Sequence, residues 1–224
     1  MKIDFHLHSN HSFDAWTPVR TVVQYAIRAG LGGFALTDHN AISGWPGAQE
    51  FIREKKLALS FVPGCEAMTE YGEVLGLFLT EKIASKNFAE VCDKIHEQGG
   101  FAVIPHPFDP LRRSACNPEK LPPELLRHVD GIEAFNARAL PPFNSKAQNF
   151  ARSRQFKLTT GGSDAHFPFE IGAAWGEIPD GVEPAIALRK GLVTPAGRHT
   201  IPLVHGPTTA LKLARKAGVL RPKI

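Results

Sequence analysis

Short apolar runs that suit β-strands alternate along this chain with amphipathic stretches that suit helices. Residues 2–8, 33–37 and 57–64 are apolar runs of strand length, and residues 19–27 carry apolar side chains at helical spacing. Two parallel strands need a long crossover connection, which is usually a helix. The alternation therefore predicts an α/β structure with a mainly parallel sheet.

The same alternation continues along the rest of the sequence. Thr17 before Pro18 is predicted to cap the first helix, and Asn87, with Glu90 three residues later, to cap another. Further strands are predicted at residues 73–79, 101–106, 131–136, 156–166, 171–179 and 200–204, and further helices at residues 44–54, 122–128, 144–155, 183–190 and 208–217.

Side chains of the kinds that bind metals gather in short clusters, and almost every cluster directly follows a predicted strand. A barrel of parallel strands collects its strand ends on one rim, whereas an open sheet gathers ligands from two or three loops at a switch point. Because so many strands contribute, we favour a barrel over an open doubly wound sheet. The set is His6, His8, Asp14, His39, Glu66, Glu73, His106, Asp164 and His166.

Two of these clusters have the spacing of a chelating pair. His6 with His8, and Asp164 with His166, are separated by two positions, so each pair points to one face of an extended chain. Glu66 follows an apolar run, where an unpaired carboxylate would be costly, and metal coordination would offset that cost. Imidazole and carboxylate ligands suit zinc, manganese or iron rather than calcium.

Neighbouring polar residues are given supporting roles. Asp38 is predicted to orient a ligand from behind, and His11 to be a loop or substrate-side residue. Several ions held together can bind a phosphate, ionise a water and stabilise a leaving oxygen. The set therefore predicts a hydrolytic site with more than one metal ion.

Composition limits the other classes of protein. With 224 residues, 43% of them hydrophobic and 21% charged, the chain fits a single globular domain over residues 1–224. No apolar stretch is long enough for a membrane span, and the first ten residues do not resemble a signal peptide. The three unpatterned cysteines, Cys65, Cys92 and Cys116, predict a reducing, cytoplasmic location.

The net charge of +4 is not concentrated in one block, and the densest basic segment is the C-terminal tail. We interpret this segment as the solvated face of a helix, with a nucleic-acid-binding tail as the alternative. Its basic residues are Arg198, Lys212, Arg215, Lys216, Arg221 and Lys223.

Motifs through most of the chain resemble the PHP (polymerase and histidinol phosphatase) superfamily. The matching pieces are HLHSNHSFD (6–14), ALTDHN (35–40), VPGCE (62–66), GEVLGLF (72–78), IPHP (104–107), GIEAFNAR (131–138) and GGSDAH (161–166). The resemblance implies a distorted (β/α)7 TIM-like barrel with a trinuclear metal centre at the C-terminal rim of the strands. It also implies a phosphoesterase in which a metal-bridging hydroxide attacks phosphorus.

The resemblance also assigns roles to individual residues. By position it makes every one of the nine side chains except Glu73 a metal ligand, with Glu66 bridging two ions. Many members have a histidine where this chain has Glu73, so Glu73 either ligates in its place or points away. The candidates for protonating the leaving group are His39, His106 and His166.

Basic side chains are needed to hold the rest of the phosphate. Arg138 and Arg112 are the candidates for this role, whereas Arg113 and Lys146 are interpreted as surface charges. The chain between His106 and Asp164 is short, so any lid formed there would be small.

The favoured function is metal-dependent hydrolysis of a small phosphorylated metabolite or nucleotide, with two or three divalent ions as cofactors. A histidinol-phosphatase-like monoesterase and a nucleic-acid exonuclease are alternatives on the same site. An amide or lactone hydrolase is disfavoured, because such barrels commonly bridge their ions with a carboxylated lysine and this chain has Glu66. A metal-binding module with little catalysis is the alternative from another class. No oligomeric state is predicted.

Overall fold

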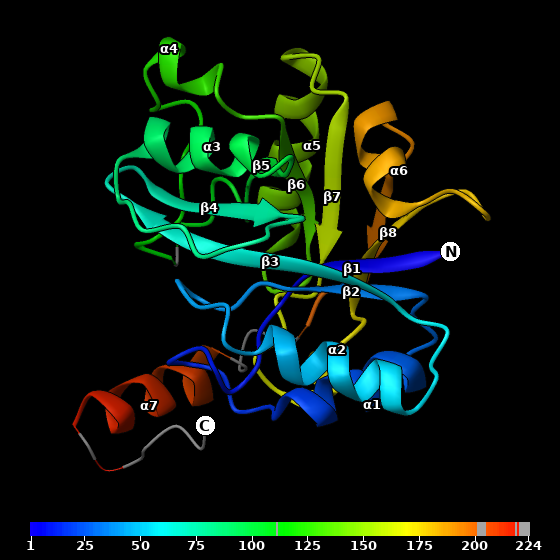
Figure 1. Cartoon of the computed structure of the whole chain (residues 1–224). Coiled ribbons are helices and arrows are strands. Elements are labelled where there is room, and N and C mark those ends of the chain that lie inside the picture. Colours follow the sequence, from blue (N-terminus) through cyan, green and yellow to red (C-terminus); the bar gives the residue numbers. More distant parts are fainter. Residues whose placement is uncertain (111, 201–204, 218, 220–224) are drawn as a thin grey trace.

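The computed structural model describes residues 1–110, 112–200, 205–217 and 219 (Figure 1). Nine strands form one sheet in the order β7-β6-β5-β4-β3-β2-β1-β8-β9. The sheet curls until the end of β7 meets β1, where Leu7 and Ala165 form an isolated parallel bridge. The backbone N–H of His8 donates to the carbonyl of Ala165 at 2.9 Å. The result is a nearly closed, barrel-shaped sheet, which confirms the predicted barrel.

The strands account for the wall of this barrel. They are β1 (Lys2–Leu7), β2 (Gly33–Leu36), β3 (Ser60–Thr69), β4 (Gly72–Leu77), β5 (Phe101–Ile104), β6 (Gly131–Asn136), β7 (Leu158–Gly162), β8 (Ala174–Glu177) and β9 (Thr194–Gly197). The helices are α1 (Val19–Arg28), α2 (Trp45–Glu54), α3 (Phe88–Glu97), α4 (Pro123–Leu126), α5 (Pro141–Ser153), the 3-10 turn η1 (Pro168–Glu170), α6 (Pro184–Lys190) and α7 (His205–Lys216).

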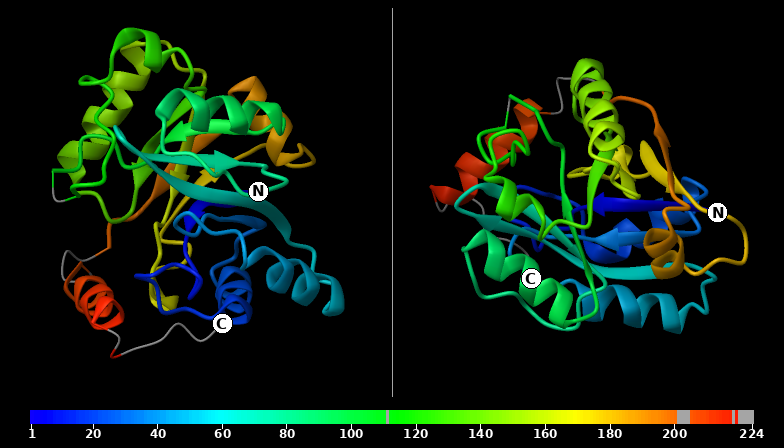
Figure 2. Two further views of the ribbon diagram at one scale, coloured as in Figure 1. Left: turned by 60° about the vertical axis from the view of Figure 1, so that its left-hand side comes forward. Right: turned by 90° about the horizontal axis from the view of Figure 1, so that it is seen from above.

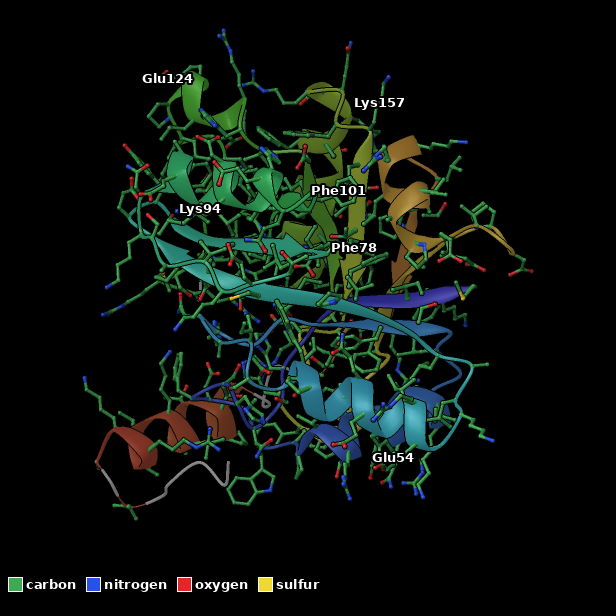
Figure 3. All side chains as sticks on the ribbon, in the orientation of Figure 1. Glu54, Phe78, Lys94, Phe101, Glu124 and Lys157 are labelled. Atoms are coloured by element: carbon green, nitrogen blue, oxygen red, sulfur yellow. The ribbon has the colours of Figure 1, made fainter. Side chains whose placement is uncertain are left out.

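The helices cover the outside of the sheet. Helices α1 and α2 lie side by side below β2 in Figure 1, α3 packs on β4 and β5, and α5 packs along β6. Two further views show α7 standing apart from the barrel strands (Figure 2). Charged side chains such as Glu54, Glu124 and Lys157 are exposed and project at the periphery (Figure 3).

The sequence predicted a mainly parallel sheet, and this prediction is wrong. Pairs β1–β2, β2–β3, β5–β6 and β6–β7 are parallel, but β3–β4, β4–β5, β1–β8 and β8–β9 are antiparallel. Between β3 and β4 lie only Glu70 and Tyr71, which suffice for a hairpin and are too few for a crossover helix. The expected count of seven β/α units is therefore not confirmed.

Most predicted elements exist, with shifts at their ends. Helix α1 begins after Pro18, and the hydroxyl of Thr17 donates to the carbonyl of His166 at 3.3 Å instead of capping the helix. Asn87 does cap α3, accepting from the backbone N–H of Glu90 at 3.0 Å. The last strand, β9, comes before the predicted residues 200–204, of which 201–204 lie outside the described residues.

Two buried apolar clusters hold the elements together. One cluster lies between the strands and the inner faces of α1, α2, α3 and α5. The other contains side chains of strands β1, β2, β3, β4, β5 and β7 and of helix α6. The three cysteines are free and buried within the fold. None of the described helices has the length and apolar character needed to cross a membrane.

Candidate metal centre

All nine metal-type side chains named from the sequence converge at one end of the barrel. His6 lies on β1 and His8 lies just after it. His39 follows β2, His106 follows β5, and Asp164 and His166 follow β7. The exposed fraction of every one of these side chains is 8% or less. The residues that follow the strands are His39, His106, Asp164 and His166, and Asp14 comes from the loop after β1.

Glu66 and Glu73 reach this cluster in a way that the sequence did not predict. Glu66 lies within β3 and not at its end, because β3 continues to Thr69. In the antiparallel β3–β4 pair, Glu66 is opposite Leu75 and Glu73 is opposite Met68. Directly opposite residues share a face, so both carboxylates point to the same side of the hairpin. Glu73 therefore points into the cluster.

A first group of ligand-type atoms surrounds the two histidines of β1. The Nε2 atoms of His6 and His8 lie 3.2 Å apart, and they lie 3.5 and 3.4 Å from Glu66 Oε2. Asp164 Oδ1 lies 3.8 Å from His6 Nε2 and 3.5 Å from His8 Nε2. These four side chains could hold one ion.

A second group joins the two hairpin carboxylates to the histidine after β5. His106 Nε2 lies 2.9 Å from Glu66 Oε1 and 3.6 Å from Glu73 Oε2. The two oxygens of Glu66 thus face different groups, as expected of a carboxylate that bridges two ions.

A third group lies at the mouth of the barrel. The carboxylate of Asp14 spans His39 and His166, with Oδ2 at 3.4 Å from His39 Nε2 and Oδ1 at 3.5 Å from His166 Nε2. His39 Nδ1 lies 3.0 Å from Glu66 Oε2, which connects this group to the first two.

The carboxylates of the cluster have the pattern expected of a cation site. Four buried oxygens receive no hydrogen bond from any described residue: Asp14 Oδ1, Glu66 Oε2, Glu73 Oε2 and Asp164 Oδ1. Each lies 3.0 to 3.6 Å from an imidazole nitrogen without forming a hydrogen bond, and a buried anionic oxygen that accepts no hydrogen bond is costly. Divalent metal ions would supply the missing positive charge, and mixed imidazole and carboxylate ligands suit them.

The same charges shift the pKa values of the histidines in opposite directions. Burial lowers the pKa of His39, but the carboxylates of Glu66 and Asp14 outweigh it and raise that pKa to about 10. Burial and the neighbouring His166 lower the pKa of His8 to about 3. Burial together with the charge of Glu66 raises the pKa of Glu73.

Three carboxylates of the cluster ionise readily. Burial raises the pKa values of Asp14, Glu66 and Asp164, but nearby cationic groups outweigh it and hold all three well below their usual range. For Asp164 the largest opposing cause is the guanidinium of Arg112.

Two of the rim residues have strained backbones. The backbone φ is 29° at His106 and 53° at Asp164, and residues other than glycine rarely adopt positive φ values. Hydrogen bonds hold both, because the N–H of His106 donates to Glu133 Oε2 at 2.7 Å and that of Asp164 to the carbonyl of His6 at 2.6 Å. Strain of this kind is typical of functional sites.

Glu133 is a candidate site residue that the sequence analysis missed. It lies on β6, and its Oε1 is 3.1 Å from His6 Nδ1. The side-chain amide of Asn136 donates to Glu133 Oε2 at 2.9 Å and to Asp164 Oδ2 at 3.1 Å. Glu133 thus fixes two histidines from behind. The sequence did contain a signal for this residue: Glu133 lies within an apolar strand, where an unpaired carboxylate would be costly, as was argued for Glu66.

Asp38 acts on the cluster through a serine. It accepts hydrogen bonds from the backbone and hydroxyl of Ser9, both at 2.7 Å, and from the hydroxyl of Ser12 at 2.9 Å. Ser12 Oγ in turn lies 3.1 Å from His8 Nδ1. His11 stays outside the cluster, with its Nδ1 2.8 Å from Ser43 Oγ.

A pocket of about 550 Å³ opens onto the third group and Glu73. Its lining residues are Asp14, His39, Glu73, Arg112, Arg113, Ser114, Arg138, His166, Thr208, Thr209 and Lys212. His106, one of the three histidines considered for proton transfer, does not line it. His39 and His166 do.

Arginine side chains are held firmly at the wall of this pocket. Arg112 Nη2 lies 2.5 Å from Asp164 Oδ2, and Arg138 Nε lies 3.0 Å from Glu170 Oε1. Arg113 is exposed, in agreement with its interpretation as a surface charge, and it also lines the pocket. Lys146 pairs with the exposed Glu119 and does not line the pocket.

Comparison with known families and proteins agrees with this geometry. Residues 4–138 match the PHP domain, and residues 141–192 match the PHP-associated region. The chain therefore belongs to the PHP domain family.

Individual proteins show the same relationship. The uncharacterised protein MJ0417 of Methanocaldococcus jannaschii is 35% identical over 180 residues, which cover 78% of this chain and 69% of the relative. The 5'-3' exoribonuclease Rnm of Salmonella typhimurium is 38% identical over 66 residues, which are 30% of this chain and 22% of that protein.

A solved structure shares the fold. It is a two-domain protein of Bacteroides vulgatus, described as containing a predicted PHP-like metal-dependent phosphoesterase. The two structures superpose with a TM-score of 0.71 at 20% sequence identity, covering 94% of this chain and 69% of the other. The chain thus has the fold of PHP-like metal-dependent phosphoesterases.

Proposed function

We propose that this protein is a metal-dependent phosphoesterase that hydrolyses a phosphate ester of a small metabolite or nucleotide. One observation carries the proposal. Nine histidine and carboxylate side chains gather in one cluster, in which four buried anionic oxygens receive no hydrogen bond from the described residues, and Asp14, His39, Glu73 and His166 of this cluster line a pocket walled by arginines. Phosphate esters are the substrates that need both cations and bidentate arginine partners.

The three groups of ligand-type atoms support a site for three divalent ions, of which zinc, manganese and iron fit the donors best. His6, His8, Glu66 and Asp164 would hold the first, and Glu66, Glu73 and His106 the second. Asp14, His39 and His166 would hold the third. When bound, such ions polarise phosphoryl oxygens and lower the pKa of water.

The remaining residues bind and orient the substrate. Arg138 is held at the pocket wall by Glu170 through Nε and by Thr208 through Nη2, so its positive charge is fixed beside the position proposed for the phosphate. Its Nη1 lies 3.0 Å from His166 Nδ1, so a phosphate that binds Arg138 lies beside the third group. Of the three histidines considered for protonating the leaving oxygen, only His39 and His166 line the pocket, and either could donate a proton only while it is not holding an ion.

Metal counting combined with a substrate panel tests the proposal. Protein purified without a chelating column should contain divalent metal and hydrolyse at least one phosphomonoester, nucleotide or short oligonucleotide. Chelation should abolish the activity, and manganese, zinc or iron should restore it. His39→Ala should lose activity, whereas His11→Ala, a histidine of the same region outside the cluster, should retain it.

The same panel separates the rival functions. Amides and lactones in the panel test an acyl hydrolase, and their hydrolysis in place of phosphoesters would contradict the proposal. A protein that binds metal but hydrolyses nothing in a metal-replete panel would be a metal-binding module. We also infer a cytoplasmic location, which the three free, buried thiols support.

A further inference from the structure

Helix α7 forms part of the wall of the pocket although it lies beyond the regions that match the family. Those regions end at residue 192, and α7 runs from His205 to Lys216. Three of its side chains, Thr208, Thr209 and Lys212, line the pocket beside the metal-type residues. Figures 1 and 2 show the helix next to the loop that follows β1 and away from the barrel wall.

The helix is attached to residues of the site itself. Arg138 Nη2 donates to Thr208 Oγ1 at 2.6 Å, so the same arginine contacts both α7 and His166. Arg215 Nη1 donates to the carbonyl of Ser12 at 2.6 Å, and Lys212 Nζ lies 4.6 Å from the ring centre of Phe13. These contacts fasten α7 to the loop that carries Asp14, which makes it a cap over the mouth of the site.

The cations of the pocket differ in how they are balanced. Arg112 pairs with Asp164 and Asp109, and Arg138 pairs with Glu170. Arg113 and Lys212 form no ion pair with any carboxylate in the described part of the chain, and both are exposed at the outer wall. The pocket therefore carries two positive charges that the protein leaves unneutralised, in addition to the arginines beside the metal-type residues.

We propose that α7 is a substrate-binding cap and that Lys212, together with Arg113, binds a second anionic group on the substrate. This inference rests on the proposed phosphoesterase function. The reacting phosphate would lie against Arg138 and the third group. A phosphate or carboxylate elsewhere on the substrate would then neutralise the outer pair of charges. The substrate class is therefore a phosphoester whose alcohol portion carries a further anionic group.

Binding of phosphonates, which are not hydrolysed, tests this proposal without depending on turnover. The affinity of the metal-loaded protein for methylphosphonate is compared by calorimetry with its affinity for α,ω-alkylene bisphosphonates of increasing length. The native protein should prefer at least one bisphosphonate. Lys212→Met should reduce that preference about tenfold, since one charged hydrogen bond contributes roughly 1.5 kcal/mol or more.

Two further variants test whether the preference depends on the charge at position 212 specifically. Lys212→Arg keeps the charge and should restore most of the preference. Lys216→Met removes a charge of the same helix that does not line the pocket, and should leave the preference unchanged. Equal preferences in Lys212→Met and the native protein, or no preference in the native protein, would overturn the proposal. If the preference depends on Lys212 but no phosphoester is hydrolysed, the phosphoesterase function fails and the anion-binding cap stands.

Discussion

Glu66 and Glu73 lie on one face of the β3–β4 hairpin, and each reaches both His39 and His106. The carboxylate of Glu66 lies 3.0 Å from His39 Nδ1 and 2.9 Å from His106 Nε2, and that of Glu73 lies 3.6 Å from the same two atoms. Burial, together with the negative charge of Glu66 nearby, raises the pKa of Glu73, because two buried carboxylates repel one another when both are ionised. A bound cation would remove that repulsion.

Replacing Glu73 should therefore change the number of bound ions. Glu73→Ala removes one side of the second group, and we expect the protein to bind fewer ions and to lose at least tenfold in activity. Glu73→His keeps a ligand at this position and should keep the ion count. Elemental analysis of both variants provides the measurement, with Glu70→Ala on the hairpin turn as the control. An unchanged ion count in Glu73→Ala would show that Glu73 is not a ligand.

Metal binding should release protons near neutral pH. The pKa of His39 is about 10 and that of His6 is raised well above its usual value, so both are protonated in the metal-free protein. An ion can bind only the neutral imidazoles, so metal affinity should rise with pH. Calorimetric titration in buffers of different ionisation enthalpy measures the protons released. A titration that shows no dependence on the buffer would rule out this linkage.

The stability of the metal-free protein should fall toward alkaline pH. The pKa of His39 is raised on folding, so the stability it contributes is complete below about pH 6.5 and is lost as the pH rises toward about 10. The lowered pKa values of Asp14, Glu66 and Asp164 act oppositely, so their contribution is lost as the pH falls below about 4. Urea unfolding measured from acid to alkaline pH should therefore give the largest free energy of unfolding between about pH 4 and about pH 6.5. A maximum above about pH 8 would contradict the assignment.

Glu133 should matter for metal affinity although it is not itself placed among the ligands. Glu133→Gln weakens the contacts to His6 Nδ1 and to the backbone N–H of His106 without removing a ligand. Loss of such a supporting partner typically reduces metal affinity or activity by roughly 10- to 100-fold. Competition with a chelating dye measures the affinity, and Glu119→Gln, an exposed carboxylate, is the matched control. Equal affinities of the two variants would contradict the role of Glu133.

Arg138 should contribute mainly to phosphate binding. Arg138→Met removes a guanidinium that Glu170 holds at the pocket wall, and inhibition by inorganic phosphate should weaken roughly 10-fold or more. Arg154→Met, on the exposed surface beyond α5, serves as the control. If phosphate inhibits Arg138→Met as strongly as the native protein, the arginine does not contact the phosphate.

The candidate site was more predictable than the fold around it. His6 and His8 could be identified because the spacing along an extended chain decides which face a side chain takes. The same spacing argument also picked out Asp164 and His166, but β7 ends at Gly162 and Asp164 has a φ of 53°, so these two reach the cluster from the turn after the strand. The direction of β4 could not, because an apolar run looks the same in parallel and antiparallel pairing and only the short turn after Thr69 distinguishes them.

Contacts between distant residues account for most of what the sequence did not predict. The position of α7 depends on the bonds from Arg138 to Thr208 and from Arg215 to Ser12, which join residues far apart in the chain. No local periodicity encodes such contacts. The role of Glu133 was hidden for a similar reason, since its partners His6 and His106 come from other strands.

The central claim, that metal ions held by this cluster hydrolyse a phosphate ester, is tested most directly by activity measured against metal content. Metal-free protein is titrated with manganese, zinc or iron while hydrolysis of the best phosphoester of the panel is followed. Activity should be absent without metal and should reach its maximum as the three groups of ligands are filled. Hydrolysis that does not depend on added metal, or none when the protein is saturated with it, would contradict the account.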